Sequence, residues 1–347
     1  MPTTLREPII PQELLPLWDD HAREAHARLA DMSIDQVIGA MPNSQFHTSD
    51  SARWVDLSPS EDHDRTKAVA FIAPYTNGWM PHIAIRAQML QDVLPEPTRV
   101  IVFPDNTLFE TAYVLTDRER LLVGGGDSGP IANKLAFTLG HLGIKEVHIL
   151  GGSEGATVGA AFLRTNAQKD KGRFKIANSG LIEPPNCLDR GIGGLEKAFF
   201  ETKMRDLTSA VCGSAIPALT EVQRAGSRLG NISQSLRIGR DYIVSKIDKN
   251  MRAVKSGMAT DSFSRDIYFA GHSFGTEYRI GIIGGGSSAI FPRGVQQQLK
   301  DFFTGINRVN ADFLVIEGEK HTMSDNVVAN ALIGRWAITG ELSQAGL

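Results

Sequence analysis

Short β-branched runs alternate with longer stretches of helical spacing through the first half of the chain. The runs AVAFIAPY (68–75), RVIVFP (99–104) and KEVHIL (145–150) stop at or near Pro, Asn or Gly, which is typical of buried strands. Between them, 82–94 and 130–143 carry apolar residues at helical spacing, and the second stretch begins with Pro and ends with Gly. Strands that alternate with helices predict a mostly parallel sheet flanked by helices, so the expected fold class is α/β.

A long helical stretch interrupts this alternation in the second half. A further strand is expected at 173–182, after which residues 184–262 have helical texture and little strand character. Strands are expected again at DIYFA (266–270) and at 312–318, with helices at 295–306 and 326–338, whereas TEYRIGIIGGGSS (276–288) predicts a weak helix. We therefore expect one core formed by 67–183 and 263–347, with 184–262 inserted as a helical cap.

Residues 1–66 form a separate, acidic segment in this division. They hold twelve Asp or Glu against five Lys or Arg, and LWDDHAREAHARLADM (17–32) has helical spacing. We expect a helix and a loop that pack on the core. The insertion has the opposite bias, with thirteen Lys or Arg against seven Asp or Glu between 190 and 265, which is typical of a solvated helical face.

The composition is that of an ordinary globular protein. The 347 residues, 42% hydrophobic and with a net charge of -3, suffice for a large core and give no overall field that attracts nucleic acid or a membrane. The sequence has no secretory signal pattern and no membrane-spanning stretch, so a cytoplasmic protein is expected. Cys187 and Cys212 stand in no metal spacing and are interpreted as plain thiols, and we expect no metal and no cofactor.

The pattern G-x-S-x-G occurs twice, at Gly151, Ser153 and Gly155 and again at 271–275 around Ser273. A nucleophile elbow requires a strand directly before the serine and a helix directly after it, because glycines allow a tight turn and the helix start stabilises negative charge. Ser153 has KEVHIL before it and EGATVGAAFLRTNA after it, whereas only a weak helix follows Ser273. Ser153 is therefore the predicted nucleophile, with a purely structural glycine turn as the alternative.

The order of residues along the chain favours the same serine. In triads on this architecture the nucleophile comes first, then the acid and then the histidine, each after a different strand. His321 follows the apolar run DFLVI (312–316), where a general base is expected. The chain between Ser153 and His321 has room for two strands and an insertion, whereas the chain after Ser273 has room for barely one strand and one helix.

Two other groups of residues have ordinary structural interpretations. GGGDSGP (124–130) stands before a predicted helix, where Asp127, Ser128 and Pro130 suit a helix start better than a protease site. His21 and His26 flank no cluster of metal-ligating residues and are interpreted as surface residues.

These segments together resemble the α/β-hydrolase fold family. RVIVFPDN (99–106) resembles the family's fourth strand with its Pro-Asp, and 132–163 resembles its helix, strand, nucleophile elbow and next helix. VIEGEKHTMSDNVVANALIGRW (315–336) resembles the last strand, the histidine loop and the closing helix. The resemblance extends over roughly 67–183 and 263–340 by the order of elements, and its specific motifs are the elbow and the histidine segment.

The resemblance implies roles for individual residues. Ser153 becomes the nucleophile and His321 the general base that takes its proton and returns it to the leaving group. The oxyanion hole is implied at the backbone N–H of Glu154 and at that of Tyr75 or Thr76, in the loop after the third strand. The carboxylate of Glu154 is unusual there, since it repels an oxyanion or favours a basic group on the substrate.

The triad acid is the least specific of these implied residues. The family usually carries it after the strand before the last, and FAGHSFGTEY (269–278) has no Asp there, which leaves Glu277 as the nearest carboxylate. Glu183, after the strand that ends near Ile182, is the alternative acid, because some members carry it one strand earlier. The sequence does not decide between Glu277 and Glu183 as the acid.

The expected function is that of a cofactor-independent serine hydrolase. It would cleave an ester, or an amide or other acyl bond, of a small-molecule substrate through an acyl-enzyme on Ser153. The alternatives are a catalytically silent α/β-hydrolase-like scaffold used for binding or assembly, and a lyase or haloperoxidase-type activity, because a fold does not fix the reaction. No nucleic-acid or membrane partner is expected, and a homo-oligomer is left open.

Overall fold

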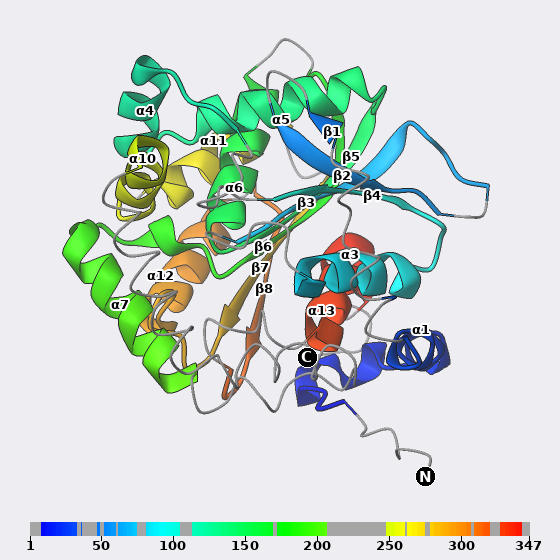
Figure 1. Ribbon diagram of the computed structural model, residues 1–347. Coiled ribbons are helices and arrows are strands. Elements are labelled where there is room, and N and C mark those ends of the chain that lie inside the picture. Colours follow the sequence, from blue (N-terminus) through cyan, green and yellow to red (C-terminus); the bar gives the residue numbers. More distant parts are fainter. Residues whose placement is uncertain are drawn as a thin grey trace.

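The computed structural model in Figure 1 describes most of the chain. The described residues are 8–32, 36, 47–48, 52–59, 62–74, 81–104, 113–168, 172–206, 248–260, 262–274, 278–306, 309–319 and 327–341. None of the helices in these ranges has the length and hydrophobicity of a membrane span.

The described strands form one eight-stranded sheet in the order β1-β2-β4-β3-β5-β6-β7-β8. The first two pairings, β1 with β2 and β2 with β4, are antiparallel, and every later pairing is parallel. The strands are β1 (His47–Thr48), β2 (Arg53–Leu57), β3 (Lys67–Ile72), β4 (Arg99–Phe103), β5 (Glu146–Gly152), β6 (Lys175–Ile182), β7 (Arg279–Gly285) and β8 (Ala311–Ile316). The parallel sheet that the alternating pattern predicts is confirmed.

Helices cover both faces of the sheet (Figure 1). One apolar cluster joins α1 (Asp20–Ala30), α3 (Pro81–Val93) and α13 (Val327–Thr339) to one face, together with the 3-10 turn η1 (Gln12–Leu17). A second cluster joins the other helices to the opposite face: α4 (Asp117–Gly124), α5 (Gly129–His141), α6 (Glu154–Ala167), α7 (Gly191–Asp206), α10 (Lys249–Met258), α11 (Phe263–Phe274) and α12 (Arg293–Thr304). Strands covered on both sides are apolar without alternation, which explains runs such as KEVHIL.

The acidic N-terminal segment contributes the helix α1 and the strands β1 and β2. The α1 helix packs on α3, and Asp19 pairs with the buried Arg335 of α13 at 2.7 Å. Residues 53–57 form β2 and extend the sheet beside β4, where the sequence pattern predicts no strand. Of the predicted cap, the described parts are the 3-10 turn η2 (Pro185–Cys187), α7 and α10, and α10 packs on α4.

The strand predicted at 266–270 is wrong, because these residues lie inside the helix α11. Phe263, Ile267 and Ala270 are fully buried, whereas Tyr268 and Phe269 are exposed, which is the three-to-four-residue period of a helix. A run as short as DIYFA does not separate the two periods. The helix predicted at 276–288 is also wrong, because RIGIIGG (279–285) forms the buried strand β7.

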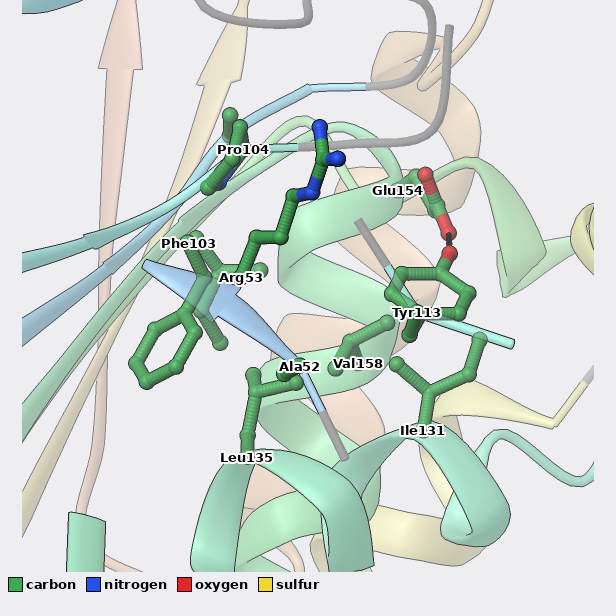
Figure 2. A pocket seen from close by; sticks show the side chains of 11 residues that line it. Ala52, Arg53, Phe103, Pro104, Tyr113, Ile131, Leu135, Glu154 and Val158 are labelled. Atoms are coloured by element: carbon green, nitrogen blue, oxygen red, sulfur yellow. Dashed lines mark hydrogen bonds between the residues drawn. The ribbon is translucent and has the colours of Figure 1, made fainter. Parts of the chain in front are cut away.

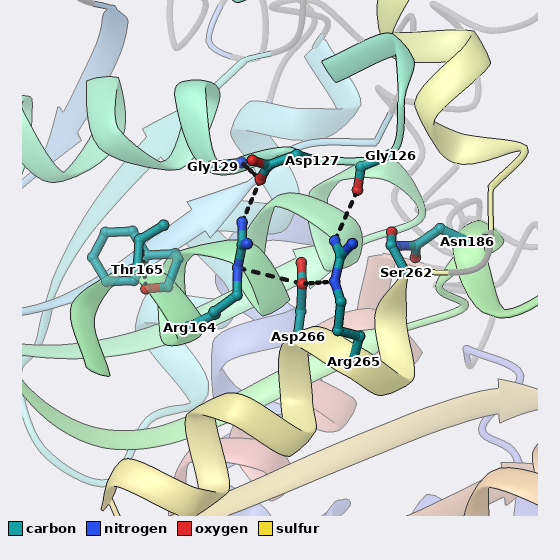
Figure 3. A network of polar contacts seen from close by, with 10 residues as sticks. Gly126, Asp127, Gly129, Arg164, Thr165, Asn186, Ser262, Arg265 and Asp266 are labelled. Carbon is teal, nitrogen blue, oxygen red and sulfur yellow. Dashed lines mark hydrogen bonds and ion pairs between the residues drawn. The ribbon is translucent and has the colours of Figure 1, made fainter. Parts of the chain in front are cut away.

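A polar network fixes α11 against its neighbours (Figure 3). Asp266, only 1% exposed, faces Arg164 of α6 at 3.3 Å and Arg265 at 3.1 Å. Arg164 also pairs with Asp127, whose Oδ1 accepts a hydrogen bond from the backbone N–H of Gly129 at the start of α5. Burial raises the pKa of Asp266, and the two arginines oppose that shift. The network therefore ties α5, α6 and α11 into one layer.

A buried histidine completes the hydrogen bonding of an irregular stretch between β5 and β6. The register between these strands shifts around His148, and the backbone N–H of Asn178 donates to His148 Nδ1 at 3.3 Å. Burial, reinforced by the charge of Lys67, lowers the pKa of His148 from 6.5 to about 4. A neutral ring suits this position, because only the neutral ring has an acceptor nitrogen.

We expect this histidine to make stability depend on pH. Between pH 6.5 and about 4, His148 is protonated in the unfolded chain but not in the folded chain. The free energy of unfolding should therefore fall by about 3 kcal/mol as the pH falls through this window. His148→Asn keeps an acceptor near Asn178 and does not titrate. Denaturant unfolding of wild type and His148→Asn at pH 7, 5.5 and 4 measures the effect. The prediction would be contradicted if the free energy of unfolding changed with pH equally in the two proteins.

Candidate active site

The sequence G-x-S-x-G forms a strained turn between a strand and a helix. β5 ends at Gly152 and α6 begins at Glu154, so Ser153 alone makes the turn, with φ 53° and ψ -118°. These angles are those of the first central residue of a type II′ turn, a position that glycine usually occupies. A non-glycine residue held there stores roughly 1–3 kcal/mol of strain. The predicted strand and helix on either side of Ser153 are confirmed.

The two glycines of the motif are required by close backbone contacts. A Cβ on Gly151 would lie 2.2 Å from the backbone oxygen of Gly155, and a Cβ on Gly155 would lie 2.2 Å from that of Ile72 in β3. Neither neighbour is a side chain that can move aside. Gly159, one turn further along α6, would meet Leu181 of β6 at 2.9 Å. Glycines therefore bring the start of α6 directly onto the ends of β3 and β5.

Glu183 occupies a matching position on the adjacent strand. Gly152 of β5 pairs with Ile182 of β6, so Ser153 and Glu183 are the next residue on each strand, and the backbone N–H of Ser153 donates to the Ile182 oxygen at 2.7 Å. Glu183 has φ 54°, and within the described ranges Ser153 and Glu183 are the only non-glycine residues with positive φ. Two strained residues thus lie side by side at the carboxyl edge of the sheet.

The Glu183 carboxylate lies over the end of β7 and is only 1% exposed. Its Oε1 accepts a hydrogen bond from the backbone N–H of Gly285, and its Oε2 accepts one from the hydroxyl of Ser288. The backbone N–H of Glu183 in turn donates to the Ile283 oxygen at 2.8 Å. Sequence reasoning missed Ser288, which could have been found only if 279–285 had been assigned as a strand.

The loop after β8 meets the same edge. The backbone N–H of Gly286 donates to the Ile316 oxygen at 2.9 Å, and that of Ser287 donates to the Glu319 oxygen at 2.8 Å. The loops after β7 and β8 are therefore hydrogen-bonded to each other as far along as Glu319. The predicted general base His321 lies outside the described residues, and so do the predicted oxyanion donors Tyr75 and Thr76.

The structure removes the reason for considering Ser273 as a second nucleophile and the reason for placing the acid at Glu277. Ser273 is exposed in the last turn of α11, so no strand precedes it and its glycine pattern is not an elbow. Glu277 is the predicted acid only if a strand ends at 270, but the strand before the last is β7, and Glu277 comes two residues before it begins. Glu277 itself lies outside the described residues. In contrast, Glu183 directly follows the end of β6.

Glu154, directly after Ser153, lines a small pocket under the elbow (Figure 2). Its carboxylate is buried and accepts a hydrogen bond from the Tyr113 hydroxyl at 2.9 Å. Figure 2 shows the Arg53 guanidinium near the same end of the pocket, whose other walls are mainly apolar. The pocket has room for about one water molecule. Sequence reasoning identified Glu154 but not Tyr113 or Arg53, which come from distant segments.

The remaining sequence motifs have structural roles in the described residues. GGGDSGP begins the helix α5 as predicted, with Asp127 rather than Ser128 accepting from the backbone. Cys187 is buried, and Cys212 lies outside the described residues. Within the described ranges, no group of three or more His, Cys, Asp or Glu side chains is arranged to hold a metal ion.

Comparisons with known proteins agree with this architecture at the level of the fold. No protein-family model matches the chain, and a search of curated proteins finds no match. Among solved structures, an esterase of Pyrobaculum calidifontis is similar over 95% of this chain and 97% of its own, with 13% identity and a TM-score of 0.50.

Two further similar structures are carboxylesterases. One, linked to the thaumarchaeon Nitrososphaera gargenis, is 17% identical over 82% of this chain and 92% of its own, with a TM-score of 0.49. The other, from Bacillus subtilis, is 11% identical over 91% of this chain and 99% of its own, with a TM-score of 0.48. The sheet order, the strained elbow after β5 and the similarity to the Pyrobaculum calidifontis esterase together identify the chain as an α/β-hydrolase-fold protein.

Proposed function

We propose that the protein is a serine hydrolase that cleaves an ester of a small-molecule substrate, with Ser153 as nucleophile, His321 as general base and Glu183 as the acid that orients the base. The observation that carries this proposal is the pair of strained residues at one sheet edge, Ser153 with φ 53° and Glu183 with φ 54°. Strained backbone persists only where the surrounding structure enforces it, and it clusters at active sites.

The position of His321 in the chain suits this role. Glu319 is hydrogen-bonded through its backbone oxygen to Ser287, which is the neighbour of the Glu183 partner Ser288. His321 follows Glu319 by two residues, and two residues span at most about 7 Å. A histidine this close to Glu319 in the sequence needs only a short segment of chain to reach the Glu183 carboxylate.

The chemistry follows from these groups. His321 would take the hydroxyl proton as the oxygen of Ser153 attacks the substrate carbonyl, and would return that proton to the leaving alcohol. The backbone N–H of Glu154, at the start of α6, would donate to the oxyanion, together with Tyr75 or Thr76. Water activated by His321 would then hydrolyse the acyl-enzyme. The insertion begins directly after Glu183 at η2, on the same sheet edge, and we propose that it helps to choose the substrate.

A fluorophosphonate probe tests this proposal directly. The full chain is incubated with the probe, the modified peptide is identified by mass spectrometry, and turnover of p-nitrophenyl acetate and butyrate is measured in parallel. We expect one modified residue, Ser153, and turnover that the probe abolishes. A label on another serine would contradict the assignment of the nucleophile, and a chain with neither label nor turnover would favour a silent scaffold instead.

A further inference from the structure

We propose that Ser288 is a positioning residue for the triad acid, whose hydroxyl, together with the backbone N–H of Gly285, holds the Glu183 carboxylate over the end of β7. This inference rests on the proposed function, in which Glu183 orients His321. The loop after β7, GSSAIFP (286–292), contains no carboxylate of its own. It supplies donors instead, and the carboxylate comes from the end of β6.

The direction of the Ser288 hydroxyl is fixed by a second hydrogen bond. The backbone N–H of Phe291 donates to Ser288 Oγ at 3.1 Å, so this oxygen acts as an acceptor from the loop and its own proton is left for Glu183 Oε2. Ser288 is 6% exposed and Glu183 is 1% exposed. A buried carboxylate requires such donors, and a hydrogen bond to an ionised oxygen is among the stronger ones.

The loop that carries Ser288 is itself held from α12. The side-chain amide of Gln296 donates to the Gly285 oxygen at 2.9 Å and to the Phe291 oxygen at 2.7 Å, which closes the two ends of the segment 285–291. Gln296 is buried, so water does not compete for these contacts. The donors that Glu183 meets are therefore in place before any substrate arrives.

The two donors also leave the carboxylate able to serve a histidine. Gly285 donates to one oxygen and Ser288 to the other, and a carboxylate accepts about four hydrogen bonds. Without the Ser288 hydroxyl, Glu183 Oε2 loses the donor that Ser288 supplies, and the carboxylate is held less firmly. A displacement of about 1 Å at a catalytic group can cost on the order of 100-fold in rate.

The test compares kcat and KM for p-nitrophenyl acetate in the full chain and its variants. Ser288→Ala is expected to lower kcat by about 10- to 100-fold with KM within about threefold of wild type, because the residue does not touch the substrate. Ser288→Thr keeps the hydroxyl and should recover most of kcat. Ser287→Ala, which removes the exposed neighbouring hydroxyl, should behave as wild type.

A double-mutant cycle separates positioning from general loosening of the loop. In a Glu183→Gln background, Ser288→Ala should lower kcat no further, because the partner through which it acts is gone. A further tenfold loss there, or wild-type kcat in Ser288→Ala alone, would overturn the inference. If Ser288→Ala does not fold, Ser288→Cys replaces it in the same experiments, because cysteine has a similar volume and is a weaker donor.

The probe distinguishes failure of this inference from failure of the proposed function. A wild-type chain that the probe does not label at Ser153 overturns the proposed function as well. A labelled wild type with an unaffected Ser288→Ala overturns this inference alone.

Discussion

Replacing Ser153 with alanine is expected to lower kcat for p-nitrophenyl esters by at least about 10⁴-fold and to abolish labelling by a fluorophosphonate. Alanine keeps the Cβ and removes only the hydroxyl that is the proposed nucleophile. The turn geometry should persist, because the neighbouring glycines and the hydrogen bond from the residue 153 backbone N–H to Ile182 are unchanged. Circular dichroism and denaturant unfolding should therefore show a folded protein.

A second substitution at the same position tests whether the strain belongs to the site. Ser153→Gly also lacks the hydroxyl, but glycine adopts φ 53° and ψ -118° freely. We expect it to be about 1 kcal/mol more stable than Ser153→Ala, since it relieves strain that alanine retains. Ser273→Ala, on the exposed face of α11, is the control and should keep wild-type labelling and kcat. Labelling that survives in Ser153→Ala would exclude Ser153 as the nucleophile.

The elbow can be predicted from sequence because its requirements are local. Gly151 and Gly155 are fixed by backbone approaches within one strand, turn and helix, and the apolar run before them is a strand buried on both faces. The same locality explains why most strands and helices of the core follow from the pattern. The fold class depends on their alternation, so it survives errors in individual elements.

Elements with weak periodicity were not predictable in the same way. DIYFA has only four apolar residues in a row, 267–270, and only the burial of Phe263, Ile267 and Ala270 on one face identifies the helix α11. RIGIIGG contains three glycines, which disfavour both helix and strand, and its β conformation depends on pairing with β6 and β8 on either side. These contacts come from segments far away in the chain.

The proposed acid, Glu183, does not follow from the sequence because of this exchange of a strand and a helix. With a strand placed at 266–270, Glu277 is the nearest carboxylate after it and would follow the strand before the last. With β7 at 279–285, the loop after it holds Ser288, whose partner Glu183 is 105 residues earlier in the chain. No local pattern relates two residues at that separation, so the choice between the acids needed the fold.

Glu183→Gln is the prediction that decides between these acids, and we expect it to lower kcat by about 10³- to 10⁴-fold. The neutral amide cannot stabilise a protonated His321. Its NH₂ group also replaces one accepting oxygen of the carboxylate, so that it faces another donor, either the Gly285 N–H or the Ser288 hydroxyl. Slow labelling of Ser153 by the probe should accompany the loss, because the probe also requires an activated hydroxyl.

Glu277→Gln is the matched control, an identical change at the other candidate carboxylate, and its kcat should stay within about threefold of wild type. Both variants are compared by denaturant unfolding, so that a loss of activity is not mistaken for a loss of folded protein. The reverse outcome, an inactive Glu277→Gln with an active Glu183→Gln, would require the acid to come from the segment before β7. The buried Glu183 carboxylate, its two donors and its strained backbone would then have a structural role only, and strain at the end of β6 would no longer indicate catalysis.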